Sequence, residues 1–309
     1  MRVLLAGKND TAVEALEFLR ERGDDVLVVG IAGDAGKDGW QRSLAAAARE
    51  LEVPLVQPAR INAPETIANL RAFEPELLVS IQYDQIFKDP FFRGIGCPCL
   101  NLHFSLLPRN RGVAPIAWAI VEGDRETGAT LHHMLVDIDA GDVVAQRPVT
   151  ISATDTGRAL YDKVSRAATE LFCEAHPFGP ELLARRIPQD ARVATYHRNG
   201  DFDFSRRQVD WTMEAAQLQR WLRALIFPPF QFPFFTLGGR EFAITAVAGE
   251  VRASQAAPGT VLAAGPSALD VAARGGSVRI LRCAGLDGRV VPMPEVTART
   301  RAGSFLASP

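Results

Sequence analysis

Hydrophobic and polar positions alternate in blocks through the first 150 residues. Short apolar runs, typical of strands buried on both faces of a sheet, occupy residues 1–6, 25–32 and 77–81. Stretches with apolar residues at helical spacing separate them, at residues 11–22, 41–51 and 62–73. Asn62 is the expected N-cap of the third of these helices. Strands that alternate with helices predict an α/β fold with a Rossmann-like, mainly parallel sheet covered by helices on both faces.

The pattern changes after about residue 177, where Pro and Arg become frequent and the periodicity fades. Beyond residue 205 a helical stretch is followed by short strand-like runs that glycine interrupts. Short strands at close spacing predict a smaller C-terminal β-barrel of the OB-like type. We therefore expect a catalytic domain at 1–185, a linker at 186–205 and the barrel domain at 206–309.

Composition narrows the class of protein further. The chain has 309 residues, of which 47% are hydrophobic, and its formal net charge is −2. The near balance of acidic and basic residues argues against a bulk electrostatic grip on nucleic acid. No apolar run approaches the roughly 20 residues that span a bilayer, and no signal-peptide cleavage site follows the N-terminal strand. Four cysteines do not indicate a disulfide scaffold, so we expect a cytoplasmic protein that has no membrane partner.

Several residues that could indicate metal or redox chemistry lack the required spacing. Cys97 and Cys99 are separated by one residue, which is too close for a zinc or redox pair. His132 and His133 lie next to each other on a predicted strand, so their rings point to opposite faces and cannot chelate one metal, although one could line a cleft. His176 and His197 are expected in packing or surface roles. We expect no metal.

The segment 101–112, NLHFSLLPRNRG, concentrates polar chemistry at the end of an apolar strand. Asn101 and His103 are two residues apart, so they face the same side of that strand. Asp139 lies downstream in the acid-rich loop VDIDAGD. An amide, an imidazole and a carboxylate beside a sheet can perform acyl transfer, and the alternative is a turn rich in Asx residues.

This segment, with Asp139 thirty-six residues after His103, resembles the signature of folate-dependent formyltransferases. Further matches, among them DW at 210–211 and RALIFPP at 223–229, extend the resemblance over nearly the whole chain. The family includes methionyl-tRNA formyltransferase, glycinamide ribonucleotide transformylase and the N-formyltransferases of nucleotide-linked amino sugars. The resemblance implies transfer of the formyl group of 10-formyltetrahydrofolate, the co-substrate, to a primary amine, with no metal.

The resemblance also implies roles for individual residues. Asn101 would donate to the formyl oxygen, and His103 would stabilise or protonate the tetrahedral oxyanion. Asp139 would orient the imidazole, favour its cationic form and take the proton of the amine. The residues expected to form the pteridine slot are Tyr83, Ile86, Phe87, Leu106, Leu107, Pro108, Val136, Asp137, Ile138 and Asp142. For Tyr83, Ile86 and Phe87 the alternative is ordinary core packing. Pro108 is in addition a candidate for a cis peptide bond.

Ser105, Arg109 and Arg111 are candidates for binding the acceptor. A guanidinium can hold a phosphate with two hydrogen bonds, and the alternative for the arginines is a solvated turn. The tRNA-modifying members of the family carry a basic insertion after the second strand. Here residues 30–43, GIAGDAGKDGWQRS, are short and hold two Asp, one Lys and one Arg.

The sequence therefore favours a small-molecule amine as the acceptor, most of all a nucleotide-linked amino sugar. The alternatives are a hydroxyornithine-type amino acid and methionyl-tRNA, so a nucleic-acid partner is not expected but tRNA stays open. The alternative outside the enzymes is a non-catalytic binding protein with the same fold. The sequence also leaves open whether the protein forms a homodimer.

Overall fold

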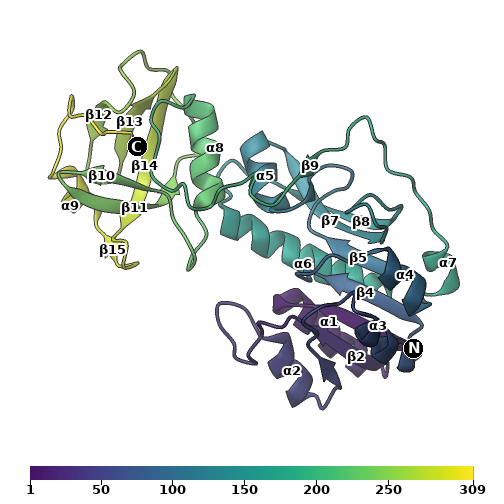
Figure 1. Ribbon diagram of the computed structural model, residues 1–309. Helices are drawn as coiled ribbons and strands as arrows, with labels where there is room; N and C mark the ends of the chain where they lie inside the picture. The colour runs from purple at the N-terminus through teal and green to yellow at the C-terminus, as the bar shows by residue number, and fades with distance from the viewer. Residues whose placement is uncertain (309) are drawn as a thin grey trace. The chain divides into compact units, whose positions relative to one another are not determined.

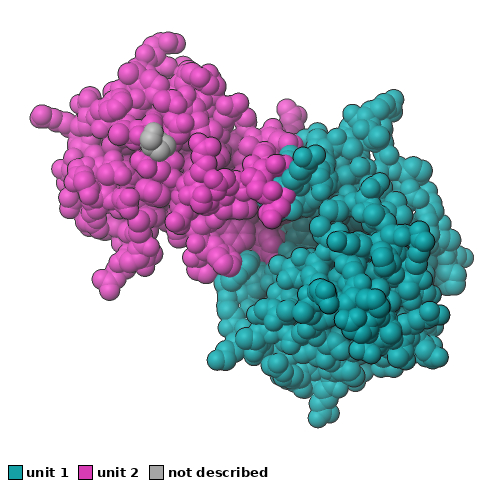
Figure 2. Space-filling view, viewed as in Figure 1, with its two compact units in different colours: residues 1–115, 127–149, 163–198 teal, residues 116–126, 150–162, 199–309 magenta. Residues whose placement is uncertain are grey.

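The computed structural model describes residues 1–308, which form two compact units (Figure 2). The first unit comprises residues 1–115, 127–149 and 163–198. The second comprises residues 116–126, 150–162 and those from 199 on. Each unit thus gathers segments that are far apart in the sequence.

The first unit is built on a seven-stranded sheet of strand order β3-β2-β1-β4-β5-β7-β8 (Figure 1). The strands are β1 (Arg2–Gly7), β2 (Asp25–Gly30), β3 (Leu55–Val56), β4 (Leu77–Ile81), β5 (Cys99–His103), β7 (Glu126–His133) and β8 (Val143–Thr150). The pairs among β1 to β5 are parallel, whereas β5 and β7 run antiparallel. Strands β2 and β3 lie on one side of β1, and β4 and β5 lie on the other, which is the arrangement of a doubly wound fold. The predicted Rossmann-like, mainly parallel sheet is therefore confirmed.

Helices cover both faces of this sheet. They are α1 (Asn9–Glu21), α2 (Leu44–Glu50), α3 (Pro64–Ala72), α4 (Asp89–Ile95) and α6 (Gly157–Ala175), and a short helix, α7 (Pro180–Leu183), follows α6. On one face Leu4 and Leu78 lie in a core with residues of α3 and α4. Leu5 alternates with Leu4 along β1 and so faces the other way, yet it is also fully buried. On α1 and α6, Phe18 and Phe172 meet edge to face at 6.4 Å between ring centres.

The start of α3 differs from the expectation. Ala63, not Asn62, is the N-cap, and no side chain caps the helix. The Asn62 amide instead donates to the carbonyl of Ile86 and accepts from the backbone N–H of Lys88, both at 2.8 Å. The prediction was wrong because this side chain fixes a neighbouring loop rather than its own helix.

A two-stranded parallel sheet ties a late segment to the first unit. It pairs β6 (Arg111–Gly112) with β9 (Tyr196–His197). Ile187 also exchanges two backbone hydrogen bonds with Val143 at the start of β8. Much of the segment expected to be a linker is therefore fixed within the first unit.

The second unit consists mainly of a curled antiparallel sheet of order β10-β11-β14-β13-β12, with β15 on β14 (Figure 1). Its strands are β10 (Phe234–Leu237), β11 (Arg240–Val247), β12 (Val261–Ala264), β13 (Leu269–Ala273), β14 (Gly276–Ala284) and β15 (Val290–Val291). The remaining helices of the chain are α5 (Pro115–Glu122), α8 (Ala215–Leu225) and α9 (Met293–Thr297). Trp211, Leu222 and Phe242 are fully buried in the core of the second unit. None of the helices that residues 1–308 form is both long enough and apolar enough to cross a membrane.

Candidate active site

Strand β5 brings Asn101 and His103 to the same side at its carboxyl end, as the spacing predicts. Antiparallel pairing with β7 sets Asn101 opposite His132. The Asn101 Nδ2 atom lies 3.1 Å from His132 Nε2 and 3.3 Å from Asp139 Oδ1. The three residues proposed as catalytic are therefore close together, with a second histidine between them.

His103 is held at both ring nitrogens. Its Nε2 lies 2.8 Å from the carbonyl oxygen of Asn110, and its Nδ1 lies 3.4 Å from Asp139 Oδ2. A carbonyl oxygen can only accept, so Nε2 carries a hydrogen. The Asp139 carboxylate lies beside the other ring nitrogen, and its role toward His103 stays a prediction.

The Asp139 carboxylate is buried and yet ionised. Burial by itself raises the pKa of Asp139, but the positive charge at His103, the contact with His132 and the N–H of Gly112 together hold that pKa well below its ordinary value. The Gly112 N–H donates to Oδ2 at 2.8 Å. Asp139 has a positive φ of 54°, a region that non-glycine residues rarely adopt, so its neighbours must hold it there.

Gly112 can occupy its position because it has no Cβ. Its φ is +86°, and a Cβ built there would lie 2.2 Å from the carbonyl oxygen of His197. This close approach brings the Gly112 N–H onto Asp139. Gly112 thus adopts a backbone conformation that favours glycine and supplies a hydrogen-bond donor to the site.

His132 is a site residue that the sequence did not assign. The structure confirms that His132 and His133 point to opposite faces, since His133 Nε2 contacts the carbonyl of Arg185 instead. His132 Nδ1 lies 2.8 Å from the carbonyl of His133, so it carries a hydrogen. Nε2 lies 3.1 Å from Asn101 Nδ2, from which it can accept, and 3.4 Å from Asp139 Oδ1. Only the pairing of β5 with β7 could have identified it.

Two of the residues expected at the pteridine slot lie in an aromatic core. Phe87 is 5% exposed, and its ring centre lies 4.7 Å from that of Phe91 and 5.4 Å from that of Tyr83. Burial raises the pKa of the Tyr83 hydroxyl above its ordinary value. Core packing therefore accounts for the contacts observed here, and a role of these rings in binding folate stays a prediction.

The other slot candidates differ in exposure. Ile86 and Val136 are large apolar side chains that are 57% and 54% exposed. The Leu107–Pro108 peptide bond is cis, which confirms the expectation for Pro108. The rest run from buried to exposed: Leu107 is buried, Leu106, Ile138 and Asp142 are half-buried, and Asp137 is exposed. Their contacts with a ligand stay predictions.

The acceptor candidates have contacts within the protein. Ser105 is fully buried, and its hydroxyl donates to the carbonyl of Arg109 at 2.7 Å. The Arg111 guanidinium donates twice to Gln189 Oε1, from Nε at 3.0 Å and from Nη2 at 2.7 Å. Arg109 is the exposed member of the set. That these residues bind an acceptor stays a prediction.

The two remaining histidines have partners that the sequence did not reveal. His197 Nε2 lies 3.1 Å from Asn110 Oδ1, and His176 Nε2 lies 2.8 Å from Asp24 Oδ2. Within residues 1–308, no group of three or more His, Cys, Asp or Glu side chains could hold a metal ion.

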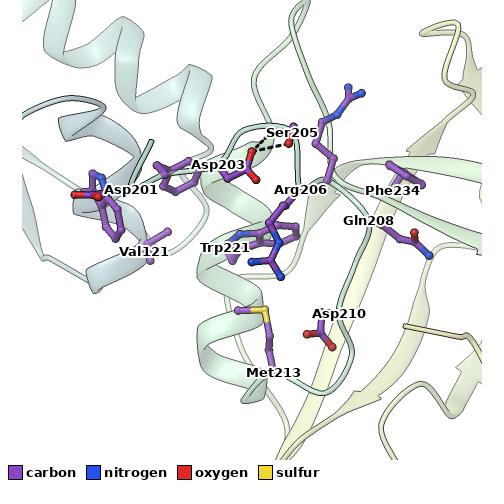
Figure 3. Close-up of a pocket in the computed structure, with 13 residues that line it drawn as sticks. Val121, Asp201, Asp203, Ser205, Arg206, Gln208, Asp210, Met213, Trp221 and Phe234 are labelled. Atoms are coloured by element: carbon purple, nitrogen blue, oxygen red, sulfur yellow. Dashed lines mark hydrogen bonds between the residues drawn. The ribbon is translucent and has the colours of Figure 1, made fainter. Parts of the chain in front are cut away.

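The second unit contains a separate cavity of about 610 Å³ (Figure 3). Its walls include Trp118, Phe202 and Trp221 together with Arg206. At its rim the Asp203 carboxylate accepts from the N–H and the hydroxyl of Ser205, at 2.9 and 2.6 Å. All the lining residues belong to the second unit, so this cavity is not the site around His103.

An amide, a histidine and an ionised carboxylate meet at the carboxyl end of a strand in a doubly wound sheet, an arrangement that can support acyl transfer in an α/β enzyme. Comparison with known protein families specifies it further. The family described as "Formyl transferase" matches residues 1–176, and "Formyl transferase, C-terminal domain" matches residues 204–301. The chain belongs to the formyl transferase family and is a formyl transfer enzyme.

Curated relatives match over nearly the whole chain. The methionyl-tRNA formyltransferase of Myxococcus xanthus is 34% identical over 309 residues, which cover 99% of this chain and 94% of the relative. That of Xanthomonas campestris pv. campestris is 33% identical over 290 residues and covers 91% of each chain.

Solved structures show the same fold at lower identity. The N-formyltransferase from Helicobacter canadensis, in complex with folinic acid and dTDP-3-aminofucose, has a TM-score of 0.73 and 22% identity and covers 90% of this chain and 98% of its own. WlaRD, a sugar 3N-formyl transferase, has a TM-score of 0.71 and 21% identity and covers 91% of this chain and 97% of its own.

Proposed function

We propose that the enzyme transfers a formyl group from 10-formyltetrahydrofolate to a primary amine at the site around Asn101, His103 and Asp139. The observation that carries this proposal is the contact of His103 Nδ1 with an ionised, buried carboxylate 3.4 Å away. The amine attacks the formyl carbon, the new C–N bond forms, the bond to N10 of the folate breaks, and the amine proton passes to N10.

The residues supply charge and protons to that step. A cationic His103 stabilises the developing oxyanion, and Asp139 stabilises the cation. Both Asn101 amide hydrogens have acceptors in the structure, Asp139 Oδ1 and His132 Nε2. For Asn101 to donate to the formyl oxygen, one of these two contacts must be exchanged.

The identity of the donor has independent support. Folinic acid, 5-N-formyl-THF and tetrahydrofolic acid appear in the names of solved structures that share the fold. They favour a reduced folate as the formyl carrier, as the resemblance of the sequence implied.

For the acceptor we favour a small molecule, a nucleotide-linked amino sugar. The loop after β2 presents little basic surface, because it holds only two basic residues, Lys37 and Arg42, and Arg42 is bonded within the protein. Asp34 accepts from the Ser43 hydroxyl at 2.5 Å and from the Ala45 N–H at 3.0 Å. Arg42 donates to Glu17 of α1 at 3.1 Å. A solved structure of the same fold contains dTDP-3-aminofucose.

A charged initiator tRNA is the second candidate. It is favoured by the 34% identity to a methionyl-tRNA formyltransferase over 99% of this chain. An acceptor comparison separates the two. The purified protein is given 10-formyltetrahydrofolate with a dTDP-linked amino sugar, with N-hydroxyornithine or with methionyl-tRNA, and the released folate and the formylated product are both measured.

We expect turnover of the sugar, with kcat/KM above that of the other acceptors. Faster formylation of methionyl-tRNA would overturn the choice of acceptor but not the transfer reaction. No turnover with any acceptor would overturn the proposed reaction. Near-normal turnover by a folded His103→Ala variant would overturn the assignment of the site.

A further inference from the structure

Residues 187–197, here called the strap, connect the two loops that carry the active-site groups. At one end Ile187 pairs with Val143, which follows the Asp139 loop. At the other end the N–H of Thr195 donates to Pro108 O at 3.2 Å, and its carbonyl accepts from Arg111 N at 3.0 Å. The Thr195 hydroxyl also accepts from the N–H of Asn110, whose carbonyl contacts His103. The strap therefore contacts the chain on the His103 side and on the Asp139 side.

Gln189 lies in the strap, and its side chain uses all its hydrogen-bonding groups. Nε2 donates to the backbone carbonyls of Asp139 and Gly141, at 2.8 and 2.7 Å. Oε1 accepts two hydrogen bonds from the guanidinium of Arg111. An amide has two donors and one acceptor oxygen with two lone pairs, so Gln189 is saturated.

These bonds close a ring around Asp139. Arg111 is bonded to Gln189, which binds the Asp139 carbonyl, and the residue after Arg111, Gly112, donates its N–H to the Asp139 carboxylate. Asp139 is thus held from its backbone and from its side chain in the positive-φ conformation that puts Oδ2 beside His103. Such a conformation persists only where the surroundings determine it.

We propose that Gln189 is a positioning residue for formyl transfer: it links Arg111 to the backbone of residues 139–141 and so sets the Asp139 carboxylate against His103. The inference rests on the proposed function, because it names a residue that serves the same site. It also gives Arg111 a definite task, the orientation of Gln189.

Because the strap around Gln189 is exposed, a loss of positioning can be distinguished from a general loss of stability when this side chain is replaced. Gln189 is half-buried, and its neighbours at 187, 188 and 190 are exposed, so the side chain contributes little to the apolar core. Removing its amide therefore changes few packing contacts but frees two carbonyls of the catalytic loop. A small displacement of a catalytic group can lower turnover by on the order of 10²-fold.

The test compares Gln189→Met, which keeps the length of the side chain but removes its hydrogen bonds, with Gln189→Glu, which keeps the acceptor for Arg111 but loses both donors. Gln57→Met is the matched control, because Gln57 Nε2 also donates to two backbone carbonyls, Ile31 and Asp34, at 2.8 and 2.7 Å. We expect both Gln189 variants to lower kcat by about 10- to 100-fold with little change in the KM of the donor, and the control to leave kcat nearly unchanged.

A double-mutant cycle separates positioning from a structural role. In an Asp139→Asn background, Gln189→Met should lower kcat no further, because there is no carboxylate left to position. Full additivity of the two effects on kcat, or a kcat of Gln189→Met equal to that of the Gln57→Met control, would overturn the inference.

A second measurement does not depend on activity. The Gly112 N–H is bonded to Asp139, so its hydrogen exchange reports whether Asp139 is held in place. We expect faster exchange at Gly112 in Gln189→Met and no change in Gln57→Met. Unchanged exchange in both would refute the positioning role. If the wild type transfers no formyl group to any acceptor, the proposed function fails while this measurement still decides the part played by Gln189.

Discussion

The Asp139 carboxylate lies 3.4 Å from Nδ1 of His103, and each of the two side chains is 9% exposed. Because both side chains have so little contact with solvent, their electrostatic interaction is only weakly screened. We therefore expect the pair to act as a unit, in which the carboxylate orients the imidazole ring.

Replacing Asp139 by Asn should lower kcat by about 10²- to 10⁴-fold, the range for a positioned acid or base. The amide keeps the size of the side chain but removes the negative charge beside His103. Steady-state assays with the best acceptor measure this loss. Asp89→Asn is the control, because Asp89 is an exposed carboxylate that pairs with Arg93. Equal kcat in both variants would refute the role given to Asp139.

The depressed pKa of Asp139 makes a prediction about stability and pH. Its folded value lies below that of an unfolded aspartate, about 3.9, so the ionised group stabilises the protein fully above that pH. This contribution is lost as the pH falls through the folded value. Urea unfolding of the wild type and of Asp139→Asn should show a difference in free energy that shrinks below about pH 4. If this difference in the free energy of unfolding grew as the pH fell, the depressed pKa of Asp139 would be contradicted.

His132 should matter for turnover and His133 should not. His132→Ala removes an acceptor from Asn101, a loss of about 1–3 kcal/mol for a buried donor, so we expect kcat to fall about 10-fold. His133→Ala is next in sequence but faces the opposite side, and its kcat should stay within about twofold of the wild type. Kinetics of the two variants under the same conditions decide the point; similar losses in both would contradict the geometry.

Gly112→Ala should cost both stability and activity. The positive φ alone costs about 1–2 kcal/mol for a residue with a Cβ, and the contact with the His197 carbonyl adds to it. Gly96→Ala is the control, since Gly96 has a φ of +78° but no atom within 4 Å of its added Cβ. Chemical unfolding should show the larger loss for Gly112→Ala, and only this variant should lose turnover. Equal effects would mean that the close approach to His197 is not important.

The sequence predicts those features that depend on neighbours along the chain. The apolar run at 77–81 became a buried strand, and the spacing of Asn101 and His103 placed both on one side. The alternation at His132 and His133 gave their opposite directions. These patterns reflect strand periodicity, which needs no knowledge of tertiary structure.

The rest depends on pairings between distant segments. His132 lies at the site because the pairing of β7 with β5 sets it opposite Asn101. The side chain of Asn62 does not cap α3 but binds a loop carbonyl 24 residues further along the chain. Gln189 lies in a Pro- and Arg-rich stretch without periodicity, which local patterns indicate only as a linker. The two carbonyls that its side chain binds lie 50 and 48 residues earlier in the chain.

The strap determines where chimeras between this enzyme and its relatives should be joined. A chimera joined at residue 185 would take Gln189, Thr195 and His197 from the other parent, and with them the bonds to Asp139 and Asn110. A junction after residue 198 keeps these partners together. The natural place to recombine the two parts therefore lies beyond the strap.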